Sequence, residues 1–127
     1  MAEAASHGIL VVDDEPELRG LLVMLLESEQ FVVYEADDGI SCLDMLRDHG
    51  EHIVLVITDL NLPRLGGADL VSRIRAFKPA VGILVMTGFA ADDVRDAVTQ
   101  AGANDFLFKP FRPDEALATV HRMTGTV

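Results

Sequence analysis

The sequence IVLVITD, residues Ile53–Asp59, places five apolar side chains in a row ahead of a threonine and an aspartate. A strand with one face in water alternates apolar and polar residues, whereas a strand covered on both faces is apolar throughout. The row therefore predicts an interior strand of a parallel sheet, with Asp59 at its carboxyl end.

Similar apolar runs occur at four other places along the chain. They are ILVV from Ile9, the weaker FVVYEA from Phe31, ILVM from Ile83, and FLF from Phe106. Segments with helical spacing separate these runs. Strand and helix thus alternate five times, which predicts an α/β fold: a doubly wound, five-stranded parallel sheet with helices on both faces.

The first helix shows the helical spacing most clearly, and its apolar stripe comprises Leu18, Leu21, Leu22, Leu25 and Leu26. Pro16 is expected to open this helix, with Asp14 as its N-cap and Glu17 as the reciprocal partner. A second helix is expected behind Asp38, with Ile40, Leu43 and Leu46 on its stripe, and a third over Leu70, Val71 and Ile74, ending before Pro79.

The fourth and fifth helices are predicted over Asp92–Ala101 and from Pro113 onward. The inner face of the fourth is expected to comprise Val94, Ala97, Val98 and Ala101. Small side chains bury little apolar area, so this helix should be the least firmly anchored.

Length and charge limit the possible functions. The 127 residues suffice for one domain, which we expect over residues 8–124, between a flexible stretch 1–7 and a C-terminal end 125–127. The net charge of -11 disfavours direct binding to nucleic acid or to an anionic membrane surface. The apolar runs are too short to span a bilayer, the N-terminus lacks a secretory signal layout, and the single Cys42 suits a reducing cytoplasm.

Polar side chains follow four of the apolar runs where each ends. They are Asp13 and Asp14, then Asp59, then Thr87, and finally Lys109. In open parallel sheets these ends share one edge, where ligands bind. At such short distances carboxylates repel one another unless a proton or a cation lies between them. Oxygen ligands of this kind suit Mg²⁺. With an ammonium and a hydroxyl beside them, the set indicates phosphoryl chemistry, with Asp59 as the best-placed acceptor.

Each residue alone also admits a purely structural role. Asp14 could serve simply as a helix cap, the Thr87 hydroxyl could bond its own backbone, and Lys109 could be a solvated charge. The histidines, His7, His49, His52 and His121, are expected to be solvated.

Four motifs carry a resemblance to a known family: VVDDE at Val11–Glu15, DLNLPRLGG at Asp59–Gly67, MTG at Met86–Gly88 and FLFKPF at Phe106–Phe111. In order and spacing the chain resembles response-regulator receiver domains of bacterial two-component signalling, including chemotaxis regulators. The resemblance implies a flavodoxin-like strand order 2-1-3-4-5.

The resemblance also implies a role for each matching residue. Asp59 would accept a phosphoryl group from the phosphohistidine of a sensor histidine kinase or a histidine phosphotransfer protein. Mg²⁺, or Mn²⁺, would be held by Asp13, Asp14, Asp59 and the backbone carbonyl of Asn61. Lys109 would pair first with the acceptor carboxylate and then with the phosphate, and the Lys109–Pro110 peptide would be cis.

The switch that the resemblance implies begins when the Thr87 hydroxyl moves to a phosphate oxygen. The ring of Phe106 then moves inward, and the surface of the fourth helix, fifth strand and fifth helix reports the change to a downstream protein or to a second copy of the chain. Phe89, two residues beyond Thr87, should slow attack by water and give a long-lived phosphoryl state.

Three other interpretations remain open. The chain could be the receiver fragment of a longer multidomain regulator whose output domain is missing. A haloacid-dehalogenase-like phosphatase is a remote alternative, because its first strand ends in Asp-x-Asp, whereas this one ends in Asp13-Asp14-Glu15. A flavin-binding flavodoxin-like module would need a phosphate loop that is absent after the first run. A receiver would be no enzyme beyond its own phosphorylation and dephosphorylation.

Overall fold

The five apolar runs form the strands of one parallel sheet, as predicted. The strands are β1 (Gly8–Val12), β2 (Val32–Ala36), β3 (Ile53–Asp59), β4 (Gly82–Thr87) and β5 (Asp105–Phe108). Their spatial order is β2-β1-β3-β4-β5, which confirms the order that the family resemblance implied. The computed structural model describes residues 7–126. The expected flexible stretch 1–7 therefore lies, apart from His7, outside the described residues, as does Val127 of the expected C-terminal end.

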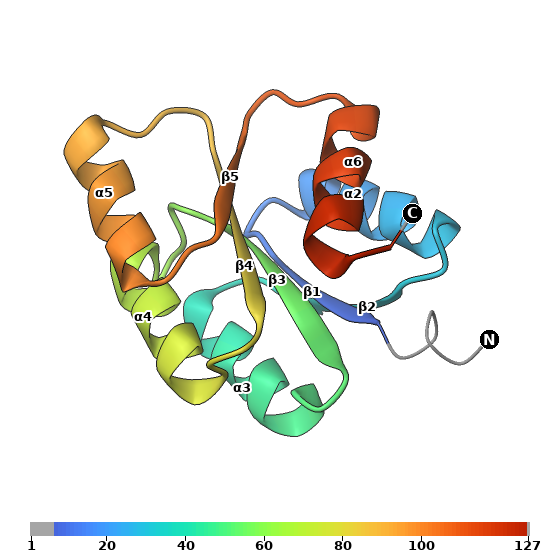
Figure 1. The fold of residues 1–127 in the computed structure, drawn as a ribbon, viewed down its shortest axis with the longest axis horizontal. Coiled ribbons are helices and arrows are strands. Elements are labelled where there is room, and N and C mark those ends of the chain that lie inside the picture. The colour runs from blue at the N-terminus through green and yellow to red at the C-terminus, as the bar shows by residue number, and fades with distance from the viewer. Residues whose placement is uncertain (1–6, 127) are drawn as a thin grey trace.

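In the part of the chain that the structure describes, five helices cover the two faces of the sheet (Figure 1). They are α2 (Pro16–Ser28), α3 (Gly39–His49), α4 (Gly67–Phe77), α5 (Asp92–Ala101) and α6 (Pro113–Thr124). One buried apolar cluster joins the sheet to α3, α4 and α5, and a second joins it to α2 and α6. The central strands are therefore apolar on both faces because helices cover both of them.

Asp38, behind which the second helix was expected, caps α3, whereas Asp14 does not cap α2. The Asp38 side chain accepts a hydrogen bond from the Ser41 N–H at 2.8 Å. The residue that precedes α2 is Glu15, and its side chain makes no capping hydrogen bond. The N-cap directly precedes the first helical residue, and Pro16 occupies that first position, so Asp14 lies one residue too early.

Helix α5 is anchored even more lightly than its sequence predicts. Of the four expected inner residues only Val98 is buried, Ala101 is half-buried, and Val94 and Ala97 are exposed. Helix α5 packs mainly against α4 rather than against the strands, so the covered side of the helix is narrower than its apolar spacing indicates. Leu21 of α2 and Ile40 of α3, also expected on inner faces, are likewise exposed.

His121, which was expected to be solvated, is instead half-buried in α6. Its Nε2 lies 2.7 Å from Glu29 Oε1, its Nδ1 lies 2.5 Å from Thr126 Oγ1, and its ring contacts Phe31. The imidazole thus ties the end of α6 to the end of α2. Within residues 7–126, none of the helices combines the length and the hydrophobicity that crossing a bilayer requires.

Candidate functional site

Three carboxylates meet at the carboxyl edge of the sheet. Strands β1 and β3 are parallel neighbours, with Val12 opposite Thr58, so the residues that follow each strand emerge side by side. One oxygen from each of Asp13, Asp14 and Asp59 lies within 4.8 Å of the other two. The sequence-based expectation that these carboxylates converge is confirmed.

Burial differs sharply within this cluster. Asp13 is 0% exposed and Asp59 is 8% exposed, whereas Asp14 faces solvent. Asp13 Oδ1 accepts a hydrogen bond from the Glu15 N–H at 2.8 Å, but Asp13 Oδ2 has no hydrogen-bond donor among the described residues. A buried carboxylate oxygen without a donor is rare, because losing its hydration is costly.

Burial raises the pKa of Asp13, and the charges of Asp59 and Glu15 act in the same direction. The Glu15 N–H and the ammonium of Lys109 lower this pKa, but they do not cancel the effect of burial. The carboxylate of Asp13 is therefore destabilised in the metal-free protein. The cluster offers only oxygen atoms as metal ligands, and one of them, Asp13 Oδ2, is buried without a hydrogen bond. Such a site fits a hard divalent cation, for which Mg²⁺ is the natural candidate.

Lys109 reaches the cluster from the carboxyl end of β5. Its Nζ lies 2.8 Å from Asp59 Oδ1, 3.6 Å from Asp13 Oδ2 and 3.7 Å from Glu15 Oε1. Burial alone lowers the pKa of Lys109, but the hydrogen bond and charge of Asp59, with the two other carboxylates, leave this pKa raised. The ammonium therefore stays charged beside Asp59. The peptide between Lys109 and Pro110 is cis, as the resemblance implied.

Thr87 is buried at the end of β4, but its hydroxyl is not bonded to the carboxylates. Thr87 Oγ1 donates to the carbonyl of Phe89 at 2.8 Å and accepts from the Phe89 N–H at 3.2 Å. This is the backbone-bonded arrangement that the sequence left open as an alternative. To reach a phosphoryl group, the hydroxyl must first leave the carbonyl of Phe89.

Phe106 is half-buried and lies in an aromatic cluster that the sequence analysis missed. Its ring stacks on Phe108 with 6.2 Å between centroids, and the Arg95 guanidinium lies 5.6 Å from the Phe106 centroid and 5.2 Å from that of Phe108. The alternation of FLF could have indicated that the two rings share one face of the strand. No local pattern could have placed Arg95 over them, because it comes from α5.

Asn61 is exposed in the loop between β3 and α4. The ligation of a metal ion by its carbonyl stays a prediction. The same loop contains Arg64, which forms an ion pair with Asp38, 26 residues away in the sequence. Sequence reasoning placed Asp38 only as the residue ahead of the second helix and gave Arg64 no role.

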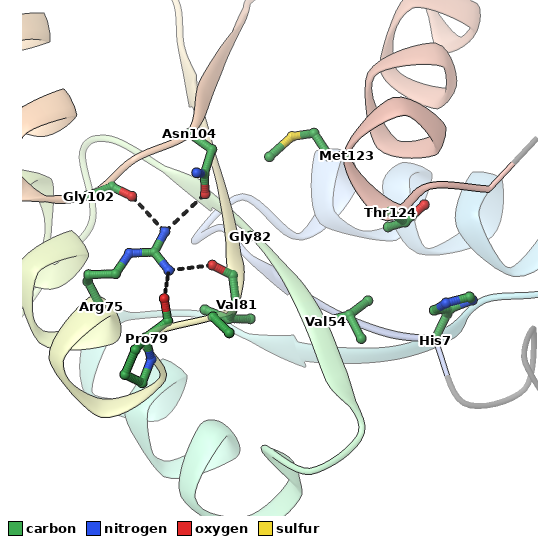
Figure 2. A pocket seen from close by; sticks show the side chains of 11 residues that line it. His7, Val54, Arg75, Pro79, Val81, Gly82, Gly102, Asn104, Met123 and Thr124 are labelled. Atoms are coloured by element: carbon green, nitrogen blue, oxygen red, sulfur yellow. Dashed lines mark hydrogen bonds between the residues drawn. The ribbon is translucent and has the colours of Figure 1, made fainter.

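A pocket lies at the opposite edge of the sheet, near the amino ends of β3 and β4 (Figure 2). Arg75 donates hydrogen bonds there to the carbonyls of Pro79, Val81 and Gly102 and to Asn104 Oδ1. These bonds occupy the guanidinium with the protein's own acceptors. The arrangement fastens α4 to the loop before β5 and explains the polar lining without a ligand.

A parallel sheet that gathers carboxylates, a lysine and a threonine at one edge defines a class of signalling domain. Residues 9–121 match the family pattern of the response regulator receiver domain. The chain therefore belongs to this family of two-component signalling domains, which confirms the resemblance found in its motifs.

The chain is similar to both full-length regulators and isolated receiver domains. It is 30% identical to the cell cycle transcriptional regulator CtrA of Caulobacter vibrioides over 113 residues, which cover 89% of this chain and 48% of CtrA. It is 33% identical to the transcriptional regulatory protein SrrA of Staphylococcus aureus over 115 residues, which cover 91% of this chain and 46% of SrrA. The chain thus spans about half the length of the curated relatives it matches.

Solved structures agree with this assignment. The receiver domain of NtrX from Brucella abortus superposes with a TM-score of 0.84 at 30% identity, covering 94% of this chain and 99% of that one. The chemotaxis response regulator CheY4 of Vibrio cholerae gives a TM-score of 0.85 at 26% identity, covering 92% of this chain and 98% of that one.

Proposed function

We propose that this domain is a phosphorylation switch in which Asp59 accepts a phosphoryl group from the phosphohistidine of a sensor histidine kinase or of a histidine phosphotransfer protein. The observation that carries the proposal is the pairing of Asp59 with Lys109 at 2.8 Å, beside the buried, donor-free oxygen of Asp13. An ordinary structural ion pair would not need two further carboxylates at the same edge.

The reaction is a displacement at phosphorus. An oxygen of Asp59 attacks the phosphorus atom, the bond from phosphorus to the histidine nitrogen breaks, and an acyl phosphate forms on Asp59. Lys109, freed from the carboxylate, neutralises an oxygen of the transferred group. Asp13, Asp14 and Asp59, with the Asn61 carbonyl, would hold Mg²⁺ or Mn²⁺, which supplies positive charge to the phosphoryl oxygens.

The signal then passes through Thr87 and Phe106. The Thr87 hydroxyl leaves the carbonyl of Phe89 and donates to a phosphoryl oxygen. The ring of Phe106 leaves its stack with Phe108 and Arg95 and moves toward the space beside Thr87. The surface of α5, β5 and α6 changes as a result, and a downstream protein or a second copy of the chain recognises it.

The proposal makes the domain a switch rather than an enzyme that turns over a separate substrate, and it places the domain in the cytoplasm, where kinase and target meet. Two kinds of output remain compatible with it. The receiver either docks to a separate partner or controls an output domain of a longer regulator, as the relatives described as transcriptional regulators suggest. The match to the receiver family leaves no observation in favour of the phosphatase or the flavin-binding alternative.

Intact-protein mass spectrometry tests the proposal directly. The protein is incubated with acetyl phosphate and Mg²⁺, beside Asp59→Asn and EDTA controls. We expect one added phosphoryl group in the wild type and none in either control. A wild type that gains no phosphoryl group and does not bind beryllofluoride would refute the proposal.

A further inference from the structure

The loop between Asp59 and α4 adopts a constrained backbone path. The Leu60 N–H donates to the Met86 carbonyl, and the Gly67 N–H donates to the Leu60 carbonyl, both at 2.9 Å. Between these two fixed points the Leu65 N–H donates to the Pro63 carbonyl at 2.8 Å, closing a three-residue turn around Arg64.

Arg64 is strained at the centre of this turn. Its φ of 67° lies in the left-handed region, which residues other than glycine rarely adopt. Such a conformation persists only where surrounding contacts hold it, and it is most often found beside functional sites. The contacts around Arg64 therefore show what holds the loop.

The side chain of Arg64 is bound to the loop before α3. Arg64 Nε lies 2.8 Å and Nη2 lies 2.6 Å from Asp38 Oδ2. The other oxygen, Asp38 Oδ1, caps α3 through the Ser41 N–H. The Asp38 side chain is only 12% exposed, so the pair is shielded from water on its acidic side. Arg64 is thus fastened to a point that α3 itself keeps rigid.

The backbone of the same loop rests directly on α3. A Cβ atom added to Gly39, the first residue of α3, would lie 2.0 Å from the Leu65 carbonyl oxygen. Only glycine permits this approach. The loop is therefore pressed against α3 by its backbone at Leu65 and tied to the cap of α3 by its side chain at Arg64.

We propose that Arg64 is a positioning residue for the metal site: its ion pair with Asp38 holds the loop so that the Asn61 carbonyl stays in place as a ligand beside the carboxylates of Asp13, Asp14 and Asp59. The inference rests on the proposed function. Arg64 itself does not touch the metal ion or the phosphoryl group. Its effect is to reduce the freedom of a ligand that a flexible loop would otherwise have to order on binding.

The test measures Mg²⁺ affinity by isothermal titration calorimetry and by the amide shifts of residues 59–61 in NMR spectra. Arg64→Ala should raise the Mg²⁺ dissociation constant about threefold to fivefold, because the loop must then be ordered when the metal binds and an ion pair of this exposure holds it by no more than such a factor. Arg64→Lys should recover part of the affinity, since an ammonium can still reach Asp38. Arg73→Ala on α4 removes an equal charge outside the loop and should change nothing.

Two further variants separate the ion pair from other causes. Arg64→Gly relieves the backbone strain, so it should fold as stably as the wild type in EDTA and still bind Mg²⁺ more weakly. Asp38→Asn keeps a side chain that caps helices well but removes the charge, and its affinity should lie between those of the wild type and Arg64→Ala.

The inference fails alone if the wild type binds Mg²⁺ and takes the phosphoryl group while Arg64→Ala and Arg64→Gly bind Mg²⁺ with unchanged affinity. A wild type that neither binds Mg²⁺ nor forms the Asp59 adduct would overturn the proposed function as well. The two failures are therefore distinguishable from the wild-type measurements.

Discussion

Because the carboxylate of Asp13 is buried beside two others, we expect that replacing Asp13 with asparagine stabilises the metal-free protein. The carboxylate oxygens lie no more than 4.8 Å apart, and at that separation, with an effective dielectric constant of about 20, two unit charges repel by about 3.5 kcal/mol. Asp13 is repelled in this way by both Asp59 and Asp14. The attraction of Lys109, whose Nζ lies 3.6 Å from Asp13, roughly offsets the repulsion by Asp59. The repulsion between Asp13 and Asp14 remains, but water around the exposed Asp14 screens part of it. Because Asp13→Asn removes this remaining repulsion, we expect it to raise the free energy of unfolding by about 1–2 kcal/mol in EDTA.

Thermal unfolding is the assay. A gain of 1 kcal/mol corresponds to a rise in Tm of about 3–5 °C for a domain of this size. In millimolar Mg²⁺ the wild type should gain stability through binding, whereas Asp13→Asn should gain little, so the difference between them narrows or reverses. Asp14→Asn is the matched control, because an exposed carboxylate costs less and its replacement should give a smaller rise in EDTA.

The pH dependence of the same pair of proteins checks the cause. Because burial raises the pKa of Asp13 above its ordinary value of 3.8, the folded protein takes up this proton at a higher pH than the unfolded chain does. The destabilising effect of Asp13 is therefore present at neutral pH and is lost as the pH falls toward 3.8. The advantage of Asp13→Asn in EDTA should shrink over that range. A variant less stable than the wild type in EDTA, or an advantage independent of pH, would refute the reasoning.

Three other substitutions test separate parts of the structure. Arg95→Ala removes the cation over the rings of Phe106 and Phe108, an interaction worth about 0.5–1 kcal/mol, and should increase the inward population of the Phe106 ring; unchanged ring chemical shifts in NMR spectra would contradict this. Phe89→Ala should shorten the lifetime of the acyl phosphate by admitting water, as followed by the decay of the mass adduct after the donor is removed; an unchanged decay rate would show that the ring does not shield the site. Gly102→Ala forces a side chain into a φ of 128° and within 2.9 Å of the Arg75 side chain, so urea unfolding should show a loss of about 2 kcal/mol. Phosphorylation of Gly102→Ala should remain normal, because Arg75 lies at the opposite edge of the sheet.

Most of the fold could be predicted because its signals are local. The consecutive apolar residues of β3 indicate a strand buried on both faces, and the polar residues that end four of the strands mark the edge where ligands bind. These signals suffice to predict that Asp13, Asp14, Asp59 and Lys109 lie at one edge of the sheet. The alternation of strands and helices then limits the topology to a few possibilities.

The features that could not be predicted depend on contacts distant in sequence or on a choice between near-equal local bonds. Helical spacing shows that Val94 and Val98 share a face, but it does not show how much of that face the neighbouring elements cover. The hydroxyl of Thr87 can bond either its own turn or a ligand, and in this structure it bonds Phe89. The pairing of Arg64 with Asp38 joins two loops, and no spacing rule relates them.

The light packing of α5 affects how a target protein and the proposed phosphoryl site would influence each other. With Val98 as its one buried side chain, α5 has little buried area to hold it in a single arrangement. Coupling between two binding sites is reciprocal. If beryllofluoride at Asp59 raises the affinity of α5 for a target by some factor, the bound target must raise the affinity of Asp59 for beryllofluoride by the same factor. The concentration of the target would then help to determine how much of the receiver is in its active state, so that the target acts on the switch as well as responding to it.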